Sequence, residues 1–347
     1  MSRTVTRRMA TSGLTAAGAV MLLPRKARAD LAALQDAARQ EAAVTWYTGQ
    51  TDAAKSERLG HAFTAEHPGI SVAVIRTTGQ VAYQRLLMDI KNHTPQCDVF
   101  STTDIAHMPI LKERHQLTPY TAENAAHLMP EFKTLSDDGY YYVTNASRYF
   151  LIYNNQKVSA ADAPKVWTDL LDPKWQGKVA TGHPAFSGCT GIWALSLRKL
   201  YGWEFFERLA KNNPRIGRSA ADPVTLLNAG ECLVGPGSAG GTYPEQDKKN
   251  PIGIVHPEDG LVLCVGPSAI PANAPHPNAA RVFLEWLLDT SYSRVIAADG
   301  SEPLLVGVPP RPGEPPLATQ KVIPLTVEEV RKGVPEVIEQ WRDTFGS

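Results

Sequence analysis

The first half of the chain repeats one pattern three times: a short apolar run, a polar break and an amphipathic segment. The runs 44–48, 71–75 and 98–101 are rich in β-branched and aromatic residues, as expected of buried strands. The segments 53–66 and 81–91 place apolar residues at helical spacing. This alternation predicts an α/β fold with a mostly parallel sheet.

The polar breaks after these three runs are candidate ligand-binding loops. Ligands of open α/β sheets bind beyond the carboxyl ends of the strands, where these loops lie. Ser, Thr and Asp also cap helix N-termini, so capping explains any single loop as well. Three such loops at equivalent positions favour a shared site. The candidates are Thr48, Gly49, Gln50, Thr78, Gly79, Thr102, Thr103 and Asp104.

A second alternation of predicted strands and helices begins at Lys178, after a predicted strand over 149–153. The stretch 236–241 is rich in Gly and is expected to be open, and the proline-rich stretch 309–316 is a connector. The predicted strands are 149–153, 179–181, 216–219, 231–235, 252–256 and 261–265, and the predicted helices are 189–200, 202–211, 222–229, 278–288 and 326–345.

Two places in this second half could hold an anion. Phe186, Ser187 and Gly188 lie where a helix begins, and the unpaired N–H groups of a helix N-terminus attract negative charge. Arg218 and Ser219 end a predicted strand, and the arginine fork suits a carboxylate or phosphate. The alternative is structural: Ser187 caps the helix and Arg218 pairs with a surface carboxylate.

Residues 1–29 have the features of a signal peptide. They carry six basic side chains and no acidic ones, an apolar run over 14–23, and the small-x-small sequence Ala27-Arg28-Ala29. The pair Arg7-Arg8 resembles a twin-arginine export signal, and the general secretory route stays open. Cleavage before Asp30 predicts an extracytoplasmic protein with 29 basic and 35 acidic residues. Its net charge of −6 gives no general attraction for nucleic acid.

The remaining motifs point away from cofactor chemistry. No dinucleotide fingerprint, P-loop or H-E-x-x-H motif is present, so neither cofactor nor metal is expected. Four cysteines occur, at positions 97, 189, 232 and 264, and an oxidising compartment permits one or two disulfides. Their long spacings, and the apolar neighbours of Cys232 and Cys264, favour buried free thiols.

Several blocks of the chain resemble the periplasmic solute-binding proteins of ABC importers, in the branch that includes ferric-iron binders. That branch also holds binders of phosphonates and phosphorylated sugars. The resemblance covers nearly all of residues 40–300 and is most specific in the combination of its blocks. These blocks are Val44–Thr48, Gln96–Asp104, Leu151–Asn154 with Trp167–Gly177, Asn228–Glu231 and Pro275–Trp286.

The resemblance implies a two-lobed type II binding-protein fold, with mixed sheets, helices on both faces and a ligand cleft between the lobes. Lobe 1 would comprise residues 30–147 and 263–301, and lobe 2 residues 148–262 and 302–347. The strands near Ser147–Leu151 and Leu261–Val265 would cross between the lobes, which close around the ligand by hinge motion. The expected protein is a monomer whose partner is an ABC permease in the inner membrane.

The ligand is expected to be a small anionic or zwitterionic solute. Ferric-iron binders of this group carry adjacent tyrosines, whereas the corresponding stretch here, Pro236–Tyr243, contains one. Ferric iron prefers hard anionic oxygen ligands, so iron is the alternative and not the leading expectation. Ser238 and Tyr243 complete the candidate ligand-binding residues. An extracytoplasmic enzyme is the second alternative, although His183, near a predicted cleft loop, has no obvious catalytic partner.

Overall fold

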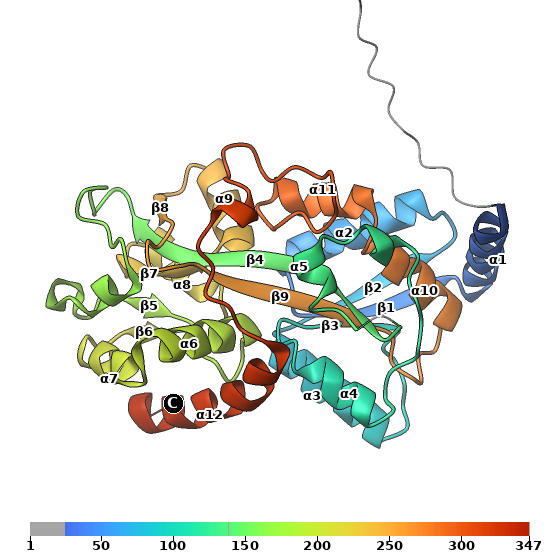
Figure 1. Ribbon diagram of the computed structural model, residues 1–347, viewed down its shortest axis with the longest axis horizontal. Coiled ribbons are helices and arrows are strands. Elements are labelled where there is room, and N and C mark those ends of the chain that lie inside the picture. The colour runs from blue at the N-terminus through green and yellow to red at the C-terminus, as the bar shows by residue number, and fades with distance from the viewer. Residues whose placement is uncertain (1–24, 138, 347) are drawn as a thin grey trace, which may run out of the picture.

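The computed structural model describes residues 25–137 and 139–346 and shows a seven-stranded mixed sheet with helices on both faces (Figure 1). The strand order is β2-β1-β3-β9-β4-β7, and β8 pairs with β4. A separate parallel pair is formed by β5 and β6. The strands are β1 (Ala43–Thr48), β2 (Ser71–Arg76), β3 (Val99–Ser101), β4 (Tyr141–Asn154), β5 (Ala180–Thr181), β6 (Arg215–Ile216), β7 (Val234–Ser238), β8 (Ile252–Val255) and β9 (Val262–Ala269).

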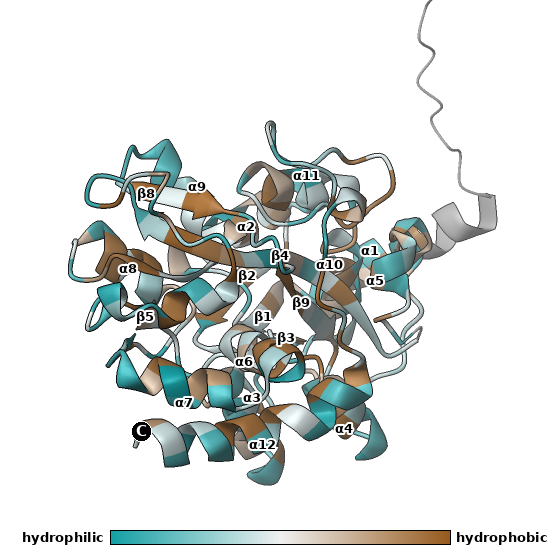
Figure 2. Cartoon of the chain, turned by 60° about the vertical axis from the view of Figure 1, so that its left-hand side comes forward, coloured by the Kyte–Doolittle hydropathy of each residue, from teal (hydrophilic) through white to brown (hydrophobic). Residues whose placement is uncertain are grey.

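Helices surround the sheet, and hydrophobic segments lie mainly in the interior while hydrophilic ones lie at the periphery (Figure 2). Among the described residues, no helix is both long and apolar enough to cross a bilayer. The α-helices are α1 (Arg25–Glu41), α2 (Ala53–Glu66), α3 (Gly79–Lys91), α4 (His107–Glu113), α5 (Pro130–Lys133), α6 (Gly188–Tyr201), α7 (Glu204–Lys211), α8 (Asp222–Asn228), α9 (Ala239–Asp247), α10 (Pro277–Trp286), α11 (Thr290–Ala298) and α12 (Val327–Phe345). Short 3-10 helices cover Asn124–His127, Trp167–Leu171, Pro173–Trp175 and Leu317–Thr319.

The first three strands are parallel, as the alternating pattern predicts. β1 pairs with β2 and with β3, and each strand is followed by a helix. Trp46 of β1 is fully buried, contacts Phe283 of α10 edge-to-face and donates its indole N–H to Ser101 Oγ at 2.8 Å. Trp46 therefore anchors α10 to the sheet, and the carboxyl ends of the three parallel strands meet at one edge.

The long antiparallel pair β4–β9 joins the two halves of the molecule. β4 pairs with β9 from Tyr141 to Tyr149 and with β7 and β8 beyond that point, while β9 also pairs with β3. In Figure 1 these two strands run between the halves. The chain returns once more at Glu302, whose N–H donates to Ala146 O at 2.8 Å. The expected crossing segments agree with this arrangement, while the exact lobe boundaries remain a prediction.

The stretch 236–241 differs from its prediction as an open loop. It contains the end of β7 and the first turn of α9. Gly237 helps to explain why this stretch does not look like a strand in the sequence: a Cβ on Gly237 would lie 2.6 Å from Ile152 Cγ2, so the packing against β4 favours glycine there. The helix α11 was not predicted. The predicted signal peptide lies almost wholly in residues 1–24, outside the described residues, and α1 begins before the expected cleavage site.

The expectation of four free thiols was wrong for two of the cysteines. Cys189 at the start of α6 and Cys264 on β9 form a disulfide, with Cα atoms 5.4 Å apart. The apolar neighbours of Cys264 reflect the burial of β9 and carry no information on pairing. Cys97 and Cys232 are free and buried, and burial raises the pKa of both thiols.

Candidate functional site

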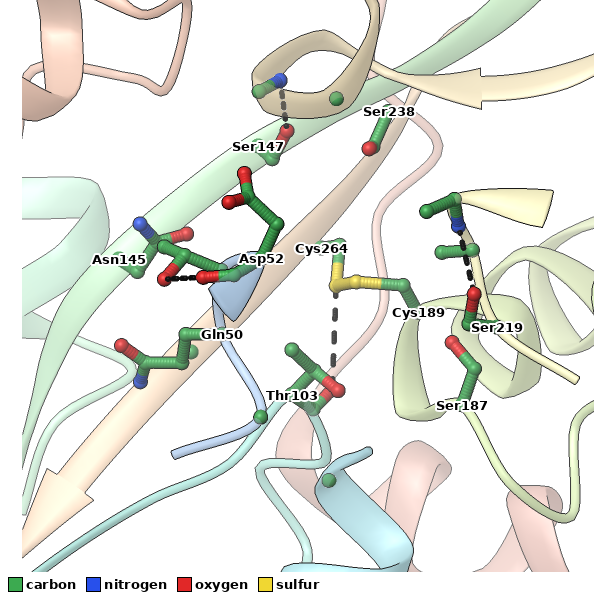
Figure 3. Close-up of a pocket in the computed structure, with 18 of the residues that line it drawn as sticks. Gln50, Asp52, Thr103, Asn145, Ser147, Ser187, Cys189, Ser219, Ser238 and Cys264 are labelled. Atoms are coloured by element: carbon green, nitrogen blue, oxygen red, sulfur yellow. Dashed lines mark hydrogen bonds between the residues drawn. A yellow bond between two sulfur atoms is a disulfide. The ribbon is translucent and has the colours of Figure 1, made fainter. Parts of the chain in front are cut away.

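A cavity of about 110 Å³ lies where the loops after β1, β2 and β3 face the second half of the molecule (Figure 3). Its described lining contains no aromatic or large aliphatic side chain and consists mainly of small polar residues. The lining residues are Gly49, Gln50, Thr51, Asp52, Lys55, Arg76, Thr78, Gly79, Thr103, Asn145, Ser147, Ser187, Cys189, Ser219, Ala220, Ala221, Ser238, Gly240, Gly241, Cys264, Gly266 and Ser301.

Close backbone approaches bring the three loops of the first half together. A Cβ on Gly49 would lie 2.5 Å from Gly79 N, and one on Gly79 would lie 2.8 Å from Thr103 Oγ1. Glycine at both positions lets the loops meet without a side chain between them. Five of the candidates from this half line the cavity: Gly49, Gln50, Thr78, Gly79 and Thr103.

The other three candidates from these loops lie behind the lining. Thr48 is fully buried. Thr102 Oγ1 hydrogen-bonds to His107 Nδ1 at 3.0 Å. The Asp104 carboxylate accepts from Ala106 N and Gln80 Nε2, at 3.0 and 2.9 Å. These residues shape the loop, and the structure does not bring them to the cavity.

From the second half, Ser187, Ser219 and Ser238 line the cavity. Ser187 is the N-cap of α6, as the structural alternative expected, and its side chain also lies at the cavity wall. The other candidates here point elsewhere: the Arg218 guanidinium stacks on Phe186 at 4.6 Å, and Tyr243 donates its hydroxyl to Glu314. Gly188 packs on Thr103, where an added Cβ would lie 2.5 Å from the carbonyl oxygen.

Four α-helices begin at the cavity wall. Their N-cap residues, Asp52 of α2, Thr78 of α3, Ser187 of α6 and Ser238 of α9, all line it. The first N–H groups of a helix lack intrahelical partners, and the helix dipole adds a partial positive charge there. The Thr78 hydroxyl is buried without a hydrogen-bond partner among the described groups. The wall therefore presents several donors to the cavity.

Charged residues gather on the α2 side of the cavity. Lys55 is 3% exposed, and its Nζ lies 3.3 Å from Asp299 Oδ2, which is also 3.3 Å from Arg58. Desolvation by burial lowers the pKa of Lys55, and the Asp299 carboxylate opposes that shift. Arg76 donates from Nε to Thr51 O at 2.9 Å.

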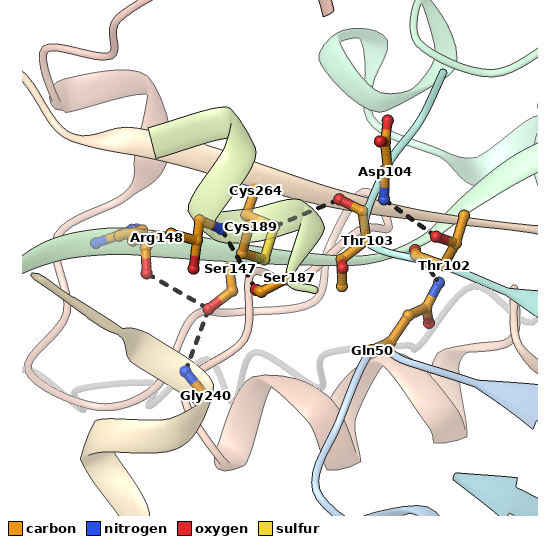
Figure 4. Close-up of a disulfide and its surroundings, with 11 residues drawn as sticks. Gln50, Thr102, Thr103, Asp104, Ser147, Arg148, Ser187, Cys189, Gly240 and Cys264 are labelled. Atoms are coloured by element: carbon orange, nitrogen blue, oxygen red, sulfur yellow. Dashed lines mark hydrogen bonds between the residues drawn. A yellow bond between two sulfur atoms is a disulfide. The ribbon is translucent and has the colours of Figure 1, made fainter. Parts of the chain in front are cut away.

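The disulfide forms part of the cavity wall (Figure 4), because Cys189 and Cys264 both line it. It joins the start of α6 to the crossing strand β9. Cys264 Sγ lies 4.0 Å from Thr103 O, next to the Gly188 contact. One covalent link and one close backbone contact therefore hold α6 against the loop after β3.

A buried ion cluster fixes the crossing strand β4 to the returning chain. Arg148 on β4 is 1% exposed, and its guanidinium lies 2.5 Å from Glu302 and 2.8 Å from Glu314. It also donates to Pro315 O at 2.7 Å. Burial raises the pKa of Glu302, and the Arg148 guanidinium opposes that rise. The cluster couples the tail to the strand that carries Ser147 at the cavity.

Several lining residues were not predicted, and some of them left a signal in the sequence. Asn145 and Ser147 are polar residues two positions apart within the wholly buried strand β4, which places both on one face. Asp52 and Lys55 belong to the first turn of the predicted helix 53–66 and its cap. No such signal marks Arg76 or Ser301, which the fold brings in from distant segments.

Comparisons with known proteins agree on one family. Residues 95–328 match the family model described as bacterial extracellular solute-binding protein. A Sinorhizobium fredii protein named "Probable ABC transporter periplasmic-binding protein" is 23% identical over 232 residues, which are 64% of this chain and 63% of that protein. A Serratia marcescens protein named "Fe(3+)-binding periplasmic protein" is 23% identical over 61% of this chain and 64% of that one. The matches span less than two thirds of these curated relatives.

Two solved structures share the fold. The periplasmic binding protein AfuA from Actinobacillus pleuropneumoniae has a TM-score of 0.78 at 19% identity, over 87% of this chain and 98% of that one. Iron-bound HitA from Pseudomonas aeruginosa has a TM-score of 0.74 at 21% identity, over 87% and 99%. Since the family model covers about two thirds of the sequence, the chain belongs to the bacterial extracellular solute-binding proteins.

Proposed function

We propose that this protein captures a small anionic solute in the cavity, in the periplasm, and delivers it as a monomer to an ABC permease of the inner membrane. One observation carries the proposal: four helix N-termini and the buried Lys55 converge on a cavity lined by small polar residues. Unpaired N–H groups at helix N-termini bind carboxylate and phosphate groups. A zwitterion also fits, because Asp52 offers one carboxylate at the same wall.

The neighbouring structures include proteins with different ligands, and the geometry of this cavity supports one of the two ligand classes over the other. The AfuA structure has fructose-6-phosphate bound, and the HitA structure is iron-bound. Tyr243 was the candidate iron ligand in this chain, but its hydroxyl is engaged with Glu314 and it does not line the cavity. This arrangement supports an anionic solute over direct binding of ferric iron.

The geometry also supports binding over catalysis. His183 was the candidate base of the enzyme alternative. Its Nδ1 accepts a hydrogen bond from Ala185 N at 3.1 Å, and its ring packs against Phe186 and Trp341. The ring is therefore part of the packing beside α6 and is not among the lining residues.

A thermal-shift series on residues 30–347 tests the proposal. Inorganic phosphate, glucose 6-phosphate and citrate are compared with neutral glucose and with ferric citrate. A solute at 100 times its Kd stabilises the folded state by about 2.7 kcal/mol, which is readily detected. We expect at least one anion to raise the melting temperature while glucose does not. If none of the three anions raises the melting temperature, the proposal is refuted.

A matched pair of variants locates the binding. Ala221 is exposed and lines the cavity, so Ala221→Trp should block it and abolish the shift. Val306 is 70% exposed outside the lining, so Val306→Trp should leave the shift intact. An anion that stabilises Ala221→Trp as much as wild type binds elsewhere, and the cavity is then not the site. Release of a chemically altered solute would support the enzyme alternative.

A further inference from the structure

Lys55 stands out among the cavity residues because it is a buried cation. Its side chain is 3% exposed, and apart from the contact with Asp299 its Nζ has no hydrogen-bond partner in the described part of the chain. An ammonium group has three donors, and burying it without partners is unfavourable. Lys55 belongs to the cavity wall, but its Nζ has almost no accessible surface, so the side chain must turn into the cavity before a bound solute can supply the missing acceptor.

The charged groups around Lys55 have a net positive charge, which favours the binding of an anion. Asp299 contacts both Lys55 and Arg58 at 3.3 Å, so one carboxylate serves two cations. Asp52 accepts the backbone N–H of Lys55 at 2.8 Å, and Arg76 is anchored to the same loop. These five charged groups comprise three cations and two carboxylates, and their sum is +1. A singly charged acidic group in the cavity would neutralise them.

We propose that Lys55 is the charge-selecting residue of the cavity, and that its ammonium group leaves Asp299 and binds the acidic group of the solute. This inference rests on the proposed function and adds the residue that makes the site prefer anions over neutral molecules of the same shape. The helix N-termini contribute donors of partial charge, whereas Lys55 contributes the full positive charge that is buried at the wall.

The ion pair with Asp299 alone suggests a purely structural role, in which Lys55 only ties α2 to the end of α11. The two roles predict different results for two substitutions. A structural role predicts that Lys55→Met and Asp299→Asn both lower stability and change anion affinity by the same small factor. A selecting role predicts that only Lys55→Met weakens anion binding, because Asp299→Asn removes a competitor for the ammonium group.

The experiment measures Kd by isothermal titration for wild type, Lys55→Met, Asp299→Asn and Lys112→Met. The probe is the tightest binder among inorganic phosphate, glucose 6-phosphate and citrate. Lys112 is the matched control, because it pairs with Asp137 at 2.5 Å outside the cavity. Loss of a charge-assisted hydrogen bond should raise Kd about 10- to 100-fold in Lys55→Met. Asp299→Asn should bind at least as tightly as wild type, and Lys112→Met should bind equally.

Each outcome separates this inference from the function on which it rests. If wild type binds none of the three anions, the proposed function fails. If wild type binds an anion and Lys55→Met binds it equally, only the role of Lys55 is overturned. Circular dichroism confirms that each variant is folded. Should Lys55→Met fail to fold, Lys55→Gln takes its place, and loss of binding in Asp299→Asn would then also count against the selecting role.

Discussion

Removing the disulfide between α6 and β9 should destabilise the protein substantially. Cys189 and Cys264 are 75 residues apart, so the bond closes a long loop in the unfolded chain. The chain-entropy relation gives about 4.5 kcal/mol for a loop of this length at 25 °C, and native disulfides typically contribute about 2–4 kcal/mol. We therefore expect Cys189→Ala/Cys264→Ala to lower the free energy of unfolding by about 3 kcal/mol.

Urea denaturation followed by tryptophan fluorescence measures the effect. With a slope of about 3 kcal/mol per molar urea, the midpoint should fall by about 1 M. Wild type reduced with a dithiol should show a similar fall, while Cys97→Ala/Cys232→Ala should respond to reduction as wild type does, because those thiols are free. If oxidised and reduced wild type unfold at the same urea concentration, the link is absent or carries no stability, and the reasoning fails.

Three further predictions concern other contacts. Arg148→Met leaves the buried Glu302 and the partly buried Glu314 without their cation and should cost about 3–5 kcal/mol in urea unfolding, whereas a loss below 1 kcal/mol would show that the cluster is unimportant. Gly188→Ala places a Cβ 2.5 Å from Thr103 O and should push α6 away from the loop after β3. Small-angle scattering should then show a larger radius of gyration, and titration should show a higher Kd for the solute. If both values are unchanged, the close contact is contradicted. The Lys199 ammonium beside Glu329 holds the pKa of that carboxyl at about 2, below its ordinary 4.5. The stability it contributes is present above pH 4.5 and is lost as pH falls from 4.5 to 2, so Glu329→Gln should reduce the urea midpoint at pH 7 and leave it unchanged at pH 2.

The parallel first half could be predicted because local pattern determines it. Each apolar run is short and bounded by polar loops, and β1 and β2 each lead into a helix whose cap residue faces the cavity. Gly49, Thr78 and Gly79 were accessible to sequence reasoning for that reason. Thr102 and Asp104 occupy the same kind of loop but turn inward, toward His107 and Gln80. Side-chain direction within a loop depends on such partners, which the sequence pattern does not reveal.

The second half depended more on contacts between distant segments. Arg218 has the chemistry of an anion ligand, yet it stacks on Phe186, because the loop before α6 lies beside it. Lys55 looked like an ordinary helix residue, and only the approach of Asp299 from the end of α11 makes it a buried cation at the cavity. The pairing of Cys189 with Cys264 is likewise set by where β9 passes α6.

The position of β9 has a consequence for the order in which the molecule can fold. This strand lies between β3 and β4 in the sheet. Its residue Ala269 pairs with Phe100 of β3, which is 169 residues earlier in the chain. Contacts of such long range require slow closure of large loops. A nascent chain that ends before Val262 already contains β3 and β4, but the edges of these two strands that β9 will join are still unpaired. Open edges of this kind invite association with other chains, so binding by chaperones is most valuable before β9 emerges.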